Sequence, residues 1–434
     1  MTVARLGLPA PAAPDGDLHA VPHLRRNLVT LGADLGLFLV GLSFGSQSTV
    51  LPAFVASLGA PNVVVGAIPA VMTAGWFLPS LFVAGHTQAL PRKLPFVLRY
   101  TVWERLPMLG LALVAFFLAA RAPALAQALV LLMLLLLTTV GGALMPAWLD
   151  VVGRSIPTRL RGRFFAAASV LGSVGGLGGG LATTYILATV PAPAGYGVCF
   201  LGGALFMALS FAALAATREP PAAPPAAAVP LAAHLRQVPG LLREEPNLAW
   251  FLLARGLAAF GAMASGFYTV YALRAWAAPA WEVGVFTTVL LLGQTAGNVA
   301  LGWLADRAGH RLVIIAGVAA SVLANVLALL APSLRTFLAV FVLYGVQVAA
   351  VNVSWLPVLL EFAPTVELRP TYVGLGNTFL APAAFAAPLL AGVAADRLGF
   401  GWTFAVSTLF GLIALALLVA RVRDPRHAGA PGAP

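Results

Sequence analysis

Long apolar segments, separated by short loops, fill the sequence from residue 28 to residue 420. A helix needs about 20 predominantly apolar residues to cross the roughly 30 Å of hydrocarbon in a bilayer. The strands of a membrane β-barrel are instead alternating segments of about 10 residues, a pattern that these runs lack. The sequence therefore predicts an all-α integral membrane protein with twelve transmembrane helices, at residues 28–57, 62–85, 95–119, 124–149, 164–189, 196–217, 247–274, 281–304, 312–331, 335–360, 371–395 and 401–420.

Charged residues are scarce and unevenly placed. They make up 9% of the chain, against about 25% in a typical soluble domain, which excludes a soluble enzyme. If the N-terminus lies in the cytoplasm, nineteen of the 25 Lys and Arg residues fall in inside loops and four in outside loops. This is the positive-inside bias of membrane proteins. The net charge of +11 therefore indicates topology, not nucleic-acid binding. We expect a multi-pass protein of the inner (cytoplasmic) membrane, embedded in the lipid bilayer, with both termini cytoplasmic.

The chain divides into two similar halves around a Pro/Ala-rich break at residues 218–230. Several residues recur in the second half at constant offsets: Trp148 as Trp355, 207 positions on, and Pro61, Gly66 and Gly75 as Pro279, Gly284 and Gly293, 218 positions on. Six spans, a linker and six similar spans form a parallel repeat, a plan common among membrane transporters. We expect a disordered arm (1–27), a six-helix bundle (28–217), a cytoplasmic linker (218–246), a second six-helix bundle (247–420) and a tail (421–434).

A motif occupies the loop between the eighth and ninth predicted spans. Residues 302–311 read GWLADRAGHR and resemble the G-x-L-x-D-R-x-G-R-R loop of the major facilitator superfamily. The matching residues are Gly302, Leu304, Asp306, Arg307, Gly309 and Arg311, and His310 stands where Arg is usual. The resemblance implies the fold of this superfamily, with two pseudo-symmetric six-helix bundles. It also implies a secondary active transporter that moves a small molecule by alternating access, for which a monomer suffices.

The residue types of this motif predict its physical role. Gly309 allows a tight turn with a positive φ. The carboxylate of Asp306 is favoured near a helix N-terminus, which by pseudo-symmetry is the start of the fifth span, beside Arg163. We therefore expect Asp306 to form a latch that holds the cytoplasmic side shut. The alternative is a solvated loop that only sets the topology.

The corresponding loop of the first half departs from the motif. It reads GHTQALPRK at residues 85–93 and lacks the Asp-Arg pair. Its expected partner is the start of the eleventh span. Arg92 or Lys93 is therefore predicted to pair with Glu367, in a latch of inverted polarity.

Four ionisable residues stand out within the predicted spans, away from their ends: Asp34, Glu104, Arg105 and Arg255. Such groups are costly in a membrane and usually functional, here in proton coupling or gating. Asp34 and Arg255 occupy nearly matching places in the two halves. They form either a gate pair, made when the inner side closes, or two groups solvated at the inner mouth. Asp34 and Glu104 are the candidate proton carriers. Glu104 and Arg105 are adjacent and are expected to point about 100° apart on their helix, with separate partners in the second or fourth span.

Neutral polar and aromatic side chains within the spans are the candidates for a substrate cavity. They are Gln47, Trp76, Tyr268, Tyr271, Gln294, Asn298, Tyr344, Gln347, Asn352 and Asn377. The sequence contains no HExxH or GxSG motif and no second Asp facing Asp34, so we expect no catalytic residues, no metal site and no cofactor. An integral-membrane enzyme is a remote alternative.

The direction of transport is predicted from the fifth span. Its glycine run, residues 175–180, resembles the Gly-Pro-x-x-Gly-Gly run of drug–proton antiporters, with Gly176 in place of Pro. This resemblance implies efflux of an apolar or amphipathic compound in exchange for protons. The fourth span lacks the Arg that proton-coupled relatives often carry. Uptake of a nutrient such as a sugar, an amino acid or an organic anion is the alternative.

Overall fold

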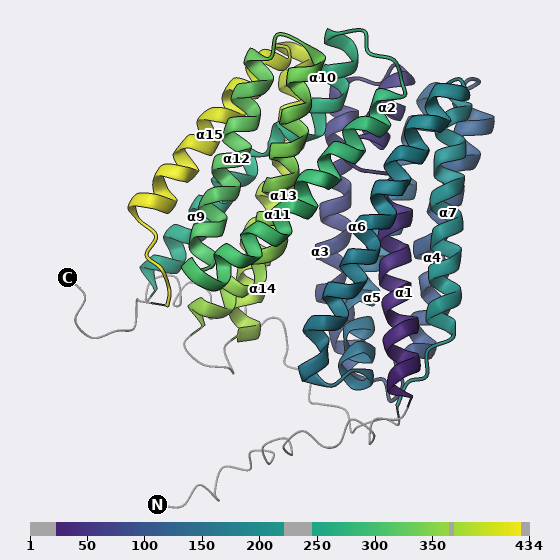
Figure 1. Cartoon of the computed structure of the whole chain (residues 1–434), viewed down its shortest axis with the longest axis vertical. Coiled ribbons are helices and arrows are strands. Elements are labelled where there is room, and N and C mark those ends of the chain that lie inside the picture. The colour runs from purple at the N-terminus through teal and green to yellow at the C-terminus, as the bar shows by residue number, and fades with distance from the viewer. Residues whose placement is uncertain (1–22, 221–244, 364–368, 427–434) are drawn as a thin grey trace, which may run out of the picture.

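The computed structural model describes residues 23–220, 245–363 and 369–426. Regular structure within them is helical, and Figure 1 shows two groups of long helices side by side. Most of the predicted N-terminal arm, most of the linker and the end of the tail lie outside the described residues, as does Glu367.

The first group comprises the helices of residues 24–215. They are α1 (Leu24–Phe44), α2 (Val50–Ser57), α3 (Asn62–Ala89), α4 (Leu94–Leu113) with a π-helical turn (Val114–Leu118), α5 (Pro123–Ser155), α6 (Thr158–Thr189) and α7 (Ala194–Ala215). The first predicted span is thus two helices, α1 and α2, separated by a break at residues 45–49. We call this group the N-terminal bundle.

The second group, the C-terminal bundle, repeats this order. Its elements are α9 (Pro246–Gly261), a 3₁₀ turn (Met263–Phe267), α10 (Tyr268–Ala275), α11 (Glu282–Ala308), α12 (His310–Leu330), α13 (Leu334–Phe362), α14 (Arg369–Arg397) and α15 (Phe400–Ala420). The seventh predicted span is broken between α9 and α10, at the place that matches the break in the first span.

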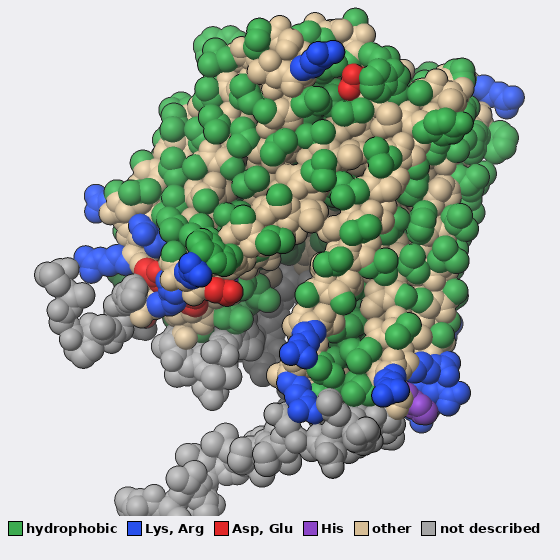
Figure 2. All heavy atoms as spheres, in the orientation of Figure 1, with side chains coloured by type: hydrophobic (Ala, Val, Ile, Leu, Met, Phe, Trp, Pro, Cys, Tyr) green, Lys and Arg blue, Asp and Glu red, His purple; other side chains and the backbone are tan. Residues whose placement is uncertain are grey.

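These lengths confirm the predicted membrane fold. Eleven helical segments in the described residues are long and apolar enough to cross a bilayer. Helix α3, whose described apolar part is Asn62–Phe77, is the remaining one of the twelve segments. Figure 2 shows hydrophobic side chains over the middle of the surface and Lys and Arg gathered at the end of the bundles where α1 and α9 begin.

The two bundles meet through two helix crossings, α3 with α14 and α6 with α11. Gly66 of α3 lies against the Pro388 carbonyl, where a Cβ would overlap it. Gly284 of α11 lies equally close to Thr184 of α6. Small residues let helix backbones approach closely in membranes. The recurrence of Gly66 as Gly284 therefore marks the two matching contacts between the bundles.

The bundles are joined at one face and separate toward the other. We call the face where α1 and α9 begin the terminal face, and the opposite one the closed face (Figure 1). Among the described residues, the hydrogen bonds between the bundles lie in the half nearer the closed face. They include those that join Ser48 to Tyr344 (2.9 Å), Thr49 to Thr287 (2.6 Å), Thr269 to the Ser48 carbonyl (2.9 Å) and Arg274 to Asn62 (3.1 Å). Figure 2 shows the surface hollowed between the bundles toward the terminal face.

Candidate functional site

An ionic cluster lies inside the N-terminal bundle, where α1, α4 and α7 meet. Arg105 Nη2 donates to Asp34 Oδ1 at 2.7 Å, and Arg105 Nη1 donates to Glu104 Oε2 at 3.2 Å. The three residues are only 8%, 3% and 9% exposed. Neutral donors complete the cluster: Ser210 and Trp148 donate to Asp34 at 2.7 and 2.9 Å, and Thr101 donates to Glu104 at 2.8 Å. Each carboxylate is therefore held by the guanidinium and at least one neutral hydrogen bond.

The predicted separation of Glu104 and Arg105 is wrong. They contact one another, because the long Arg side chain folds back along α4 and also reaches Thr101. Arg105 also bonds Asp34 of α1 and Ser210 of α7, and Glu104 also accepts from Thr101 of α4, so these partners lie outside the second and fourth predicted spans. Asp34 is paired with Arg105 in its own bundle, so the gate pair with Arg255, expected when the inner side closes, is not formed in this conformation and stays a prediction.

A cavity of about 290 Å³ lies beside this cluster. Its wall includes Asp34, Glu104 and Arg105, together with Trp76 and Trp148. The rest of the lining is mostly apolar, from Leu35, Phe38, Leu39, Leu42, Val97, Leu144, Met145 and Leu214. Of the predicted cavity residues, Trp76 is therefore placed at this cavity. Trp148 lines it as well and also donates a hydrogen bond to Asp34 of the cluster.

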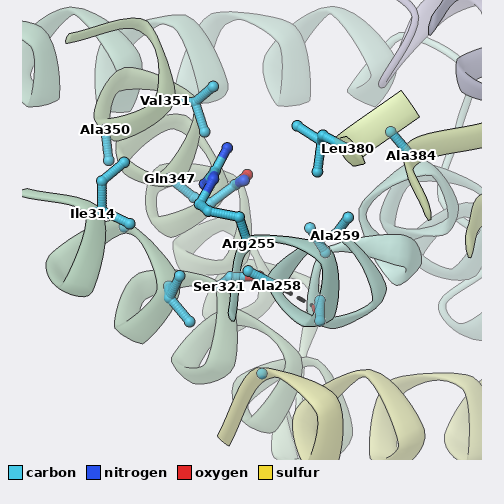
Figure 3. Close-up of a pocket in the computed structure, with 15 residues that line it drawn as sticks. Arg255, Ala258, Ala259, Ile314, Ser321, Gln347, Ala350, Val351, Leu380 and Ala384 are labelled. Carbon is cyan, nitrogen blue, oxygen red and sulfur yellow. Dashed lines mark hydrogen bonds between the residues drawn. The ribbon is translucent and has the colours of Figure 1, made fainter. Parts of the chain in front are cut away.

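A second cavity, of about 170 Å³, lies in the C-terminal bundle and contains Arg255 of α9 (Figure 3). Gln347 of α13 projects into the same space. The Arg255 guanidinium lies 4.8 Å from the ring centre of Trp355, whose indole donates to Asn377 at 3.1 Å. The structure thus brings three predicted site residues together: Arg255, Gln347 and Asn377.

Other predicted cavity residues take different places. Tyr268 is 1% exposed, packs among aromatic rings and donates to Asn325 at 2.7 Å, so its assignment to the cavity is wrong. Tyr271 packs against Trp276 and neighbouring Phe rings. Tyr344 bonds Ser48 between the bundles. The remaining four differ in exposure: Gln47 and Asn352 are exposed, whereas Gln294 and Asn298 are half-buried.

The motif at residues 302–311 lies at the terminal face, between α11 and α12. Gly309 has φ +89°, which confirms the predicted positive φ. Asp306 is exposed and makes no hydrogen bond or ion pair among the described residues. Arg163, at the start of α6, is likewise exposed. The predicted latch between Asp306 and α6 is therefore not formed in this conformation.

The remaining residues of the motif hold the loop locally. Arg307 stacks 4.1 Å from the ring centre of Trp303, and Arg311 donates to the Leu418 carbonyl at 2.8 Å. A Cβ on Gly302 would meet no atom within 4 Å. In the first-half loop, Lys93 Nζ lies 3.1 Å from Asp150, and the proposed partner Glu367 lies outside the described residues.

A second copy of the motif, missed in the sequence, lies at the closed face. Asp396, Arg397 and Gly399 repeat Asp306, Arg307 and Gly309 exactly 90 positions later. Gly399 has φ +85°, close to the value at Gly309. The two carboxylate oxygens of Asp396 accept hydrogen bonds from the Asn62 and Val63 N–H groups, at 2.8 and 2.9 Å. Asp396 of the C-terminal bundle thus caps the first turn of α3 in the N-terminal bundle.

Comparison with known proteins relates this architecture to a known family. A sequence profile described as Major Facilitator Superfamily matches residues 271–434, which include both copies of the motif. Most of the C-terminal bundle therefore matches the major facilitator superfamily. A thioclapurine efflux transporter of the same superfamily, from Claviceps purpurea (strain 20.1), is 24% identical over 144 residues. That match spans 33% of this chain and 26% of the relative's length.

Solved structures of transporters share the fold of the chain over both bundles. A variant of the nucleoside transporter NupG superposes with TM-score 0.72 at 13% identity, covering 91% of this chain and 100% of that chain. A bacterial homologue of the human lysosomal transporter Spinster, inward-facing and unoccupied, gives 0.70 at 14% identity, covering 94% and 99%. A D-xylose–proton symporter gives 0.69 at 14%, covering 92% and 98%. The protein therefore has the fold of these transporters, with helices long and apolar enough to cross a membrane many times.

Proposed function

We propose that this transporter exports an apolar or amphipathic small molecule across the cytoplasmic membrane in exchange for protons. The observation that carries the proposal is the charge balance of the buried cluster around Asp34. It contains two carboxyl groups and one guanidinium, all more than nine-tenths buried. With every group ionised, the cluster holds one uncompensated negative charge in a low-dielectric interior, which is costly.

One bound proton removes that imbalance. With one carboxyl protonated, the cluster is neutral and its hydrogen bonds can be kept. Asp34 and Glu104 share the Arg105 guanidinium, so a proton on either carboxyl leaves the cation matched by one carboxylate. The cluster can therefore alternate between a proton-loaded and a proton-free state, which is what coupling to a proton gradient requires.

The cavity beside the cluster supports an apolar or amphipathic substrate. Its lining is mostly aliphatic and aromatic, with Trp76 and Trp148 at the wall. Ligand pockets of this kind take apolar compounds and orient them with a few polar groups. Efflux is also the activity named for the Claviceps purpurea relative.

The two Asp-Arg-x-Gly copies support alternating access. In the conformation seen here, Asp396 holds the closed face together through the N-terminus of α3. Asp306 is exposed at the terminal face, where the bundles separate. Closing that face would bring Asp306 to the N-terminus of α6, while Asp396 would leave α3. With the orientation predicted from the basic residues, the terminal face is cytoplasmic and the conformation is inward-facing.

Dye accumulation in a bacterium stripped of its main efflux pumps tests the function. We expect cells that express the wild-type chain to accumulate less of a fluorescent lipophilic dye than cells with empty vector. A protonophore should abolish that difference, and Asp34→Asn should fail to lower accumulation because it removes one of the two carboxyls. Asp424→Asn is the matched control, since Asp424 lies in the C-terminal tail and pairs with Arg426.

Three outcomes would contradict the proposal. Unchanged dye accumulation in every strain would exclude export of lipophilic cations and dyes. Higher accumulation with the wild type would indicate uptake, the alternative direction. Export that survives the protonophore, or that Asp34→Asn retains at the level of Asp424→Asn, would exclude the cluster as the site of proton coupling.

A further inference from the structure

Arg255 is a buried cation without a counter-charge. It is 8% exposed, and among the described residues it makes no hydrogen bond and no ion pair. Its contact is with the face of the Trp355 ring. An unpaired charge inside a membrane protein is expensive, and a cation–π contact at about 0.5–2 kcal/mol offsets a small part of that cost.

The position of Arg255 excludes hydration of its guanidinium at the membrane surface. Arg side chains near a helix end reach the membrane surface and stay hydrated. Arg255 lies about 13 Å along α9 from Pro246, at 1.5 Å per residue, and its side chain projects into the cavity of Figure 3. Its guanidinium is therefore directed at the cavity and not at the membrane surface.

The cavity offers one more polar group for a ligand. Gln347 lines the same cavity as Arg255 and has no hydrogen-bond partner among the described residues (Figure 3). Ser321, also in the lining, already donates to the Gly261 carbonyl at 3.4 Å. The remaining wall is apolar, including Ile314, Val351 and Leu380.

These features define the chemistry of a ligand. A guanidinium presents parallel N–H groups that match the two oxygens of a carboxylate, and its single charge balances one negative charge. An amide beside it can donate a further hydrogen bond. A cavity of about 150 Å³ with apolar walls holds a benzene molecule, so the space of about 170 Å³ takes one ring-sized apolar group.

We infer that Arg255 and Gln347 bind the carboxylate of a small organic anion with an apolar body. This inference rests on the proposed function and narrows its substrate class, from amphipathic compounds in general to amphipathic monocarboxylates. The N-terminal cluster then binds and releases the proton, and the C-terminal cavity binds the anionic group of the substrate.

Binding of radiolabelled benzoate to the purified full chain in a neutral detergent tests this inference. Wild-type protein should bind benzoate, and benzamide, which has the same ring without the charge, should compete at least about tenfold less well. Inorganic phosphate should also compete poorly, which distinguishes a carboxylate site from a phosphate or lipid-headgroup site. Equal competition by benzamide would overturn the inference without any variant.

Variants then assign the site. Arg255→Gln should weaken benzoate binding about tenfold or more, and Arg255→Lys, which keeps the charge but not the fork, should weaken it less. Arg335→Gln, an exposed Arg at the start of α13, is the matched control and should bind as the wild type does. Unchanged binding by Arg255→Gln that elutes as a monodisperse peak would exclude this site. No proton gradient is present, so this result is independent of the dye test.

Discussion

The two bundles surround their buried arginines with different kinds of partner. Arg105 of the N-terminal bundle contacts two carboxylates and two hydroxyl groups. Arg255 of the C-terminal bundle contacts an aromatic ring and borders a cavity. Each arginine sits with a Trp of the internal repeat, because Trp148 bonds the Arg105 partner Asp34 and Trp355 stacks on Arg255. The repeat thus preserves the place of the Trp while the charges around it have diverged.

The two Asp-Arg-x-Gly copies show the same kind of difference. Asp396 accepts two backbone hydrogen bonds across the bundle interface, whereas Asp306 makes none. Satisfied groups such as Arg105 and Asp396 stabilise the conformation that the structure shows. Arg255 and Asp306 have no ionic or hydrogen-bond partner among the described residues. Arg255 therefore indicates what the molecule binds, and Asp306 indicates a contact that forms in another conformation.

The largest expected effect is the difference in the free energy of unfolding between the variants of the two buried arginines. Arg105→Gln leaves two buried carboxyl groups without their cation and should lower the free energy of unfolding by about 3–5 kcal/mol. Arg255→Gln removes a charge that has no partner, so we expect the free energy to change by less than about 1 kcal/mol or to rise. Unfolding of the purified proteins by SDS, followed by tryptophan fluorescence, measures both. Equal losses in the two variants would show that Arg255 is also paired within the protein.

The next effect concerns the two aspartates of the repeated motif. Asp396→Asn should shift the population away from the terminal-face-open conformation, and Asp306→Asn should shift it toward that conformation. A carboxylate at a helix N-terminus contributes about 1 kcal/mol, or about fivefold in population. Double electron–electron resonance reads this shift from spin labels at Arg121 and Arg335 on the closed face.

The labelling background for this measurement is low, because the one native cysteine, Cys199, is buried. A second label pair at the terminal face, Arg159 and Leu312, serves as the complementary measurement, since its distance should change in the opposite sense. Shifts in the same direction for both aspartate variants would contradict the assignment of the two motif copies to opposite conformations.

The smallest expected effect is the difference in the free energy of unfolding between variants of the two repeated tryptophans, Trp148 and Trp355. Trp148→Phe loses a hydrogen bond to an ionised carboxylate and should cost about 1.5–3 kcal/mol. Trp355→Phe keeps a ring against Arg255 and loses a bond to the neutral Asn377, at about 0.5–1.5 kcal/mol. The same SDS unfolding assay compares them. A larger loss in Trp355→Phe would place the stronger ionic site in the C-terminal bundle.

Much of the fold could be predicted because it depends on local composition. Span length and hydrophobicity follow from the thickness of the bilayer, and the paired Gly66 and Gly284 follow from close helix crossings. The positive φ of Gly309 follows from its place in a tight turn. Buried charges are rare within spans, so Asp34, Glu104, Arg105 and Arg255 could be selected before their partners were known.

The partners themselves could not be predicted. Asp34 contacts Arg105, 71 positions away, and not the pseudo-symmetric Arg255, because helix packing inside one bundle decides which side chains meet. Tyr268 and Gln347 are both polar residues within spans, yet one packs among aromatic rings and the other lines a cavity. That choice depends on the rotation of each helix about its axis.

By itself, the sequence determined the membrane class, the spans, the internal repeat and the resemblance to the major facilitator superfamily, since each depends on residue types and spacings along the chain. Only the tertiary structure decided that Asp396 closes one face while Asp306 stays exposed at the other. The two motif copies have the same Asp-Arg-x-Gly pattern and nearly the same backbone turn. They differ because a helix N-terminus of the other bundle lies within reach of Asp396 alone, and that depends on how the two bundles are docked.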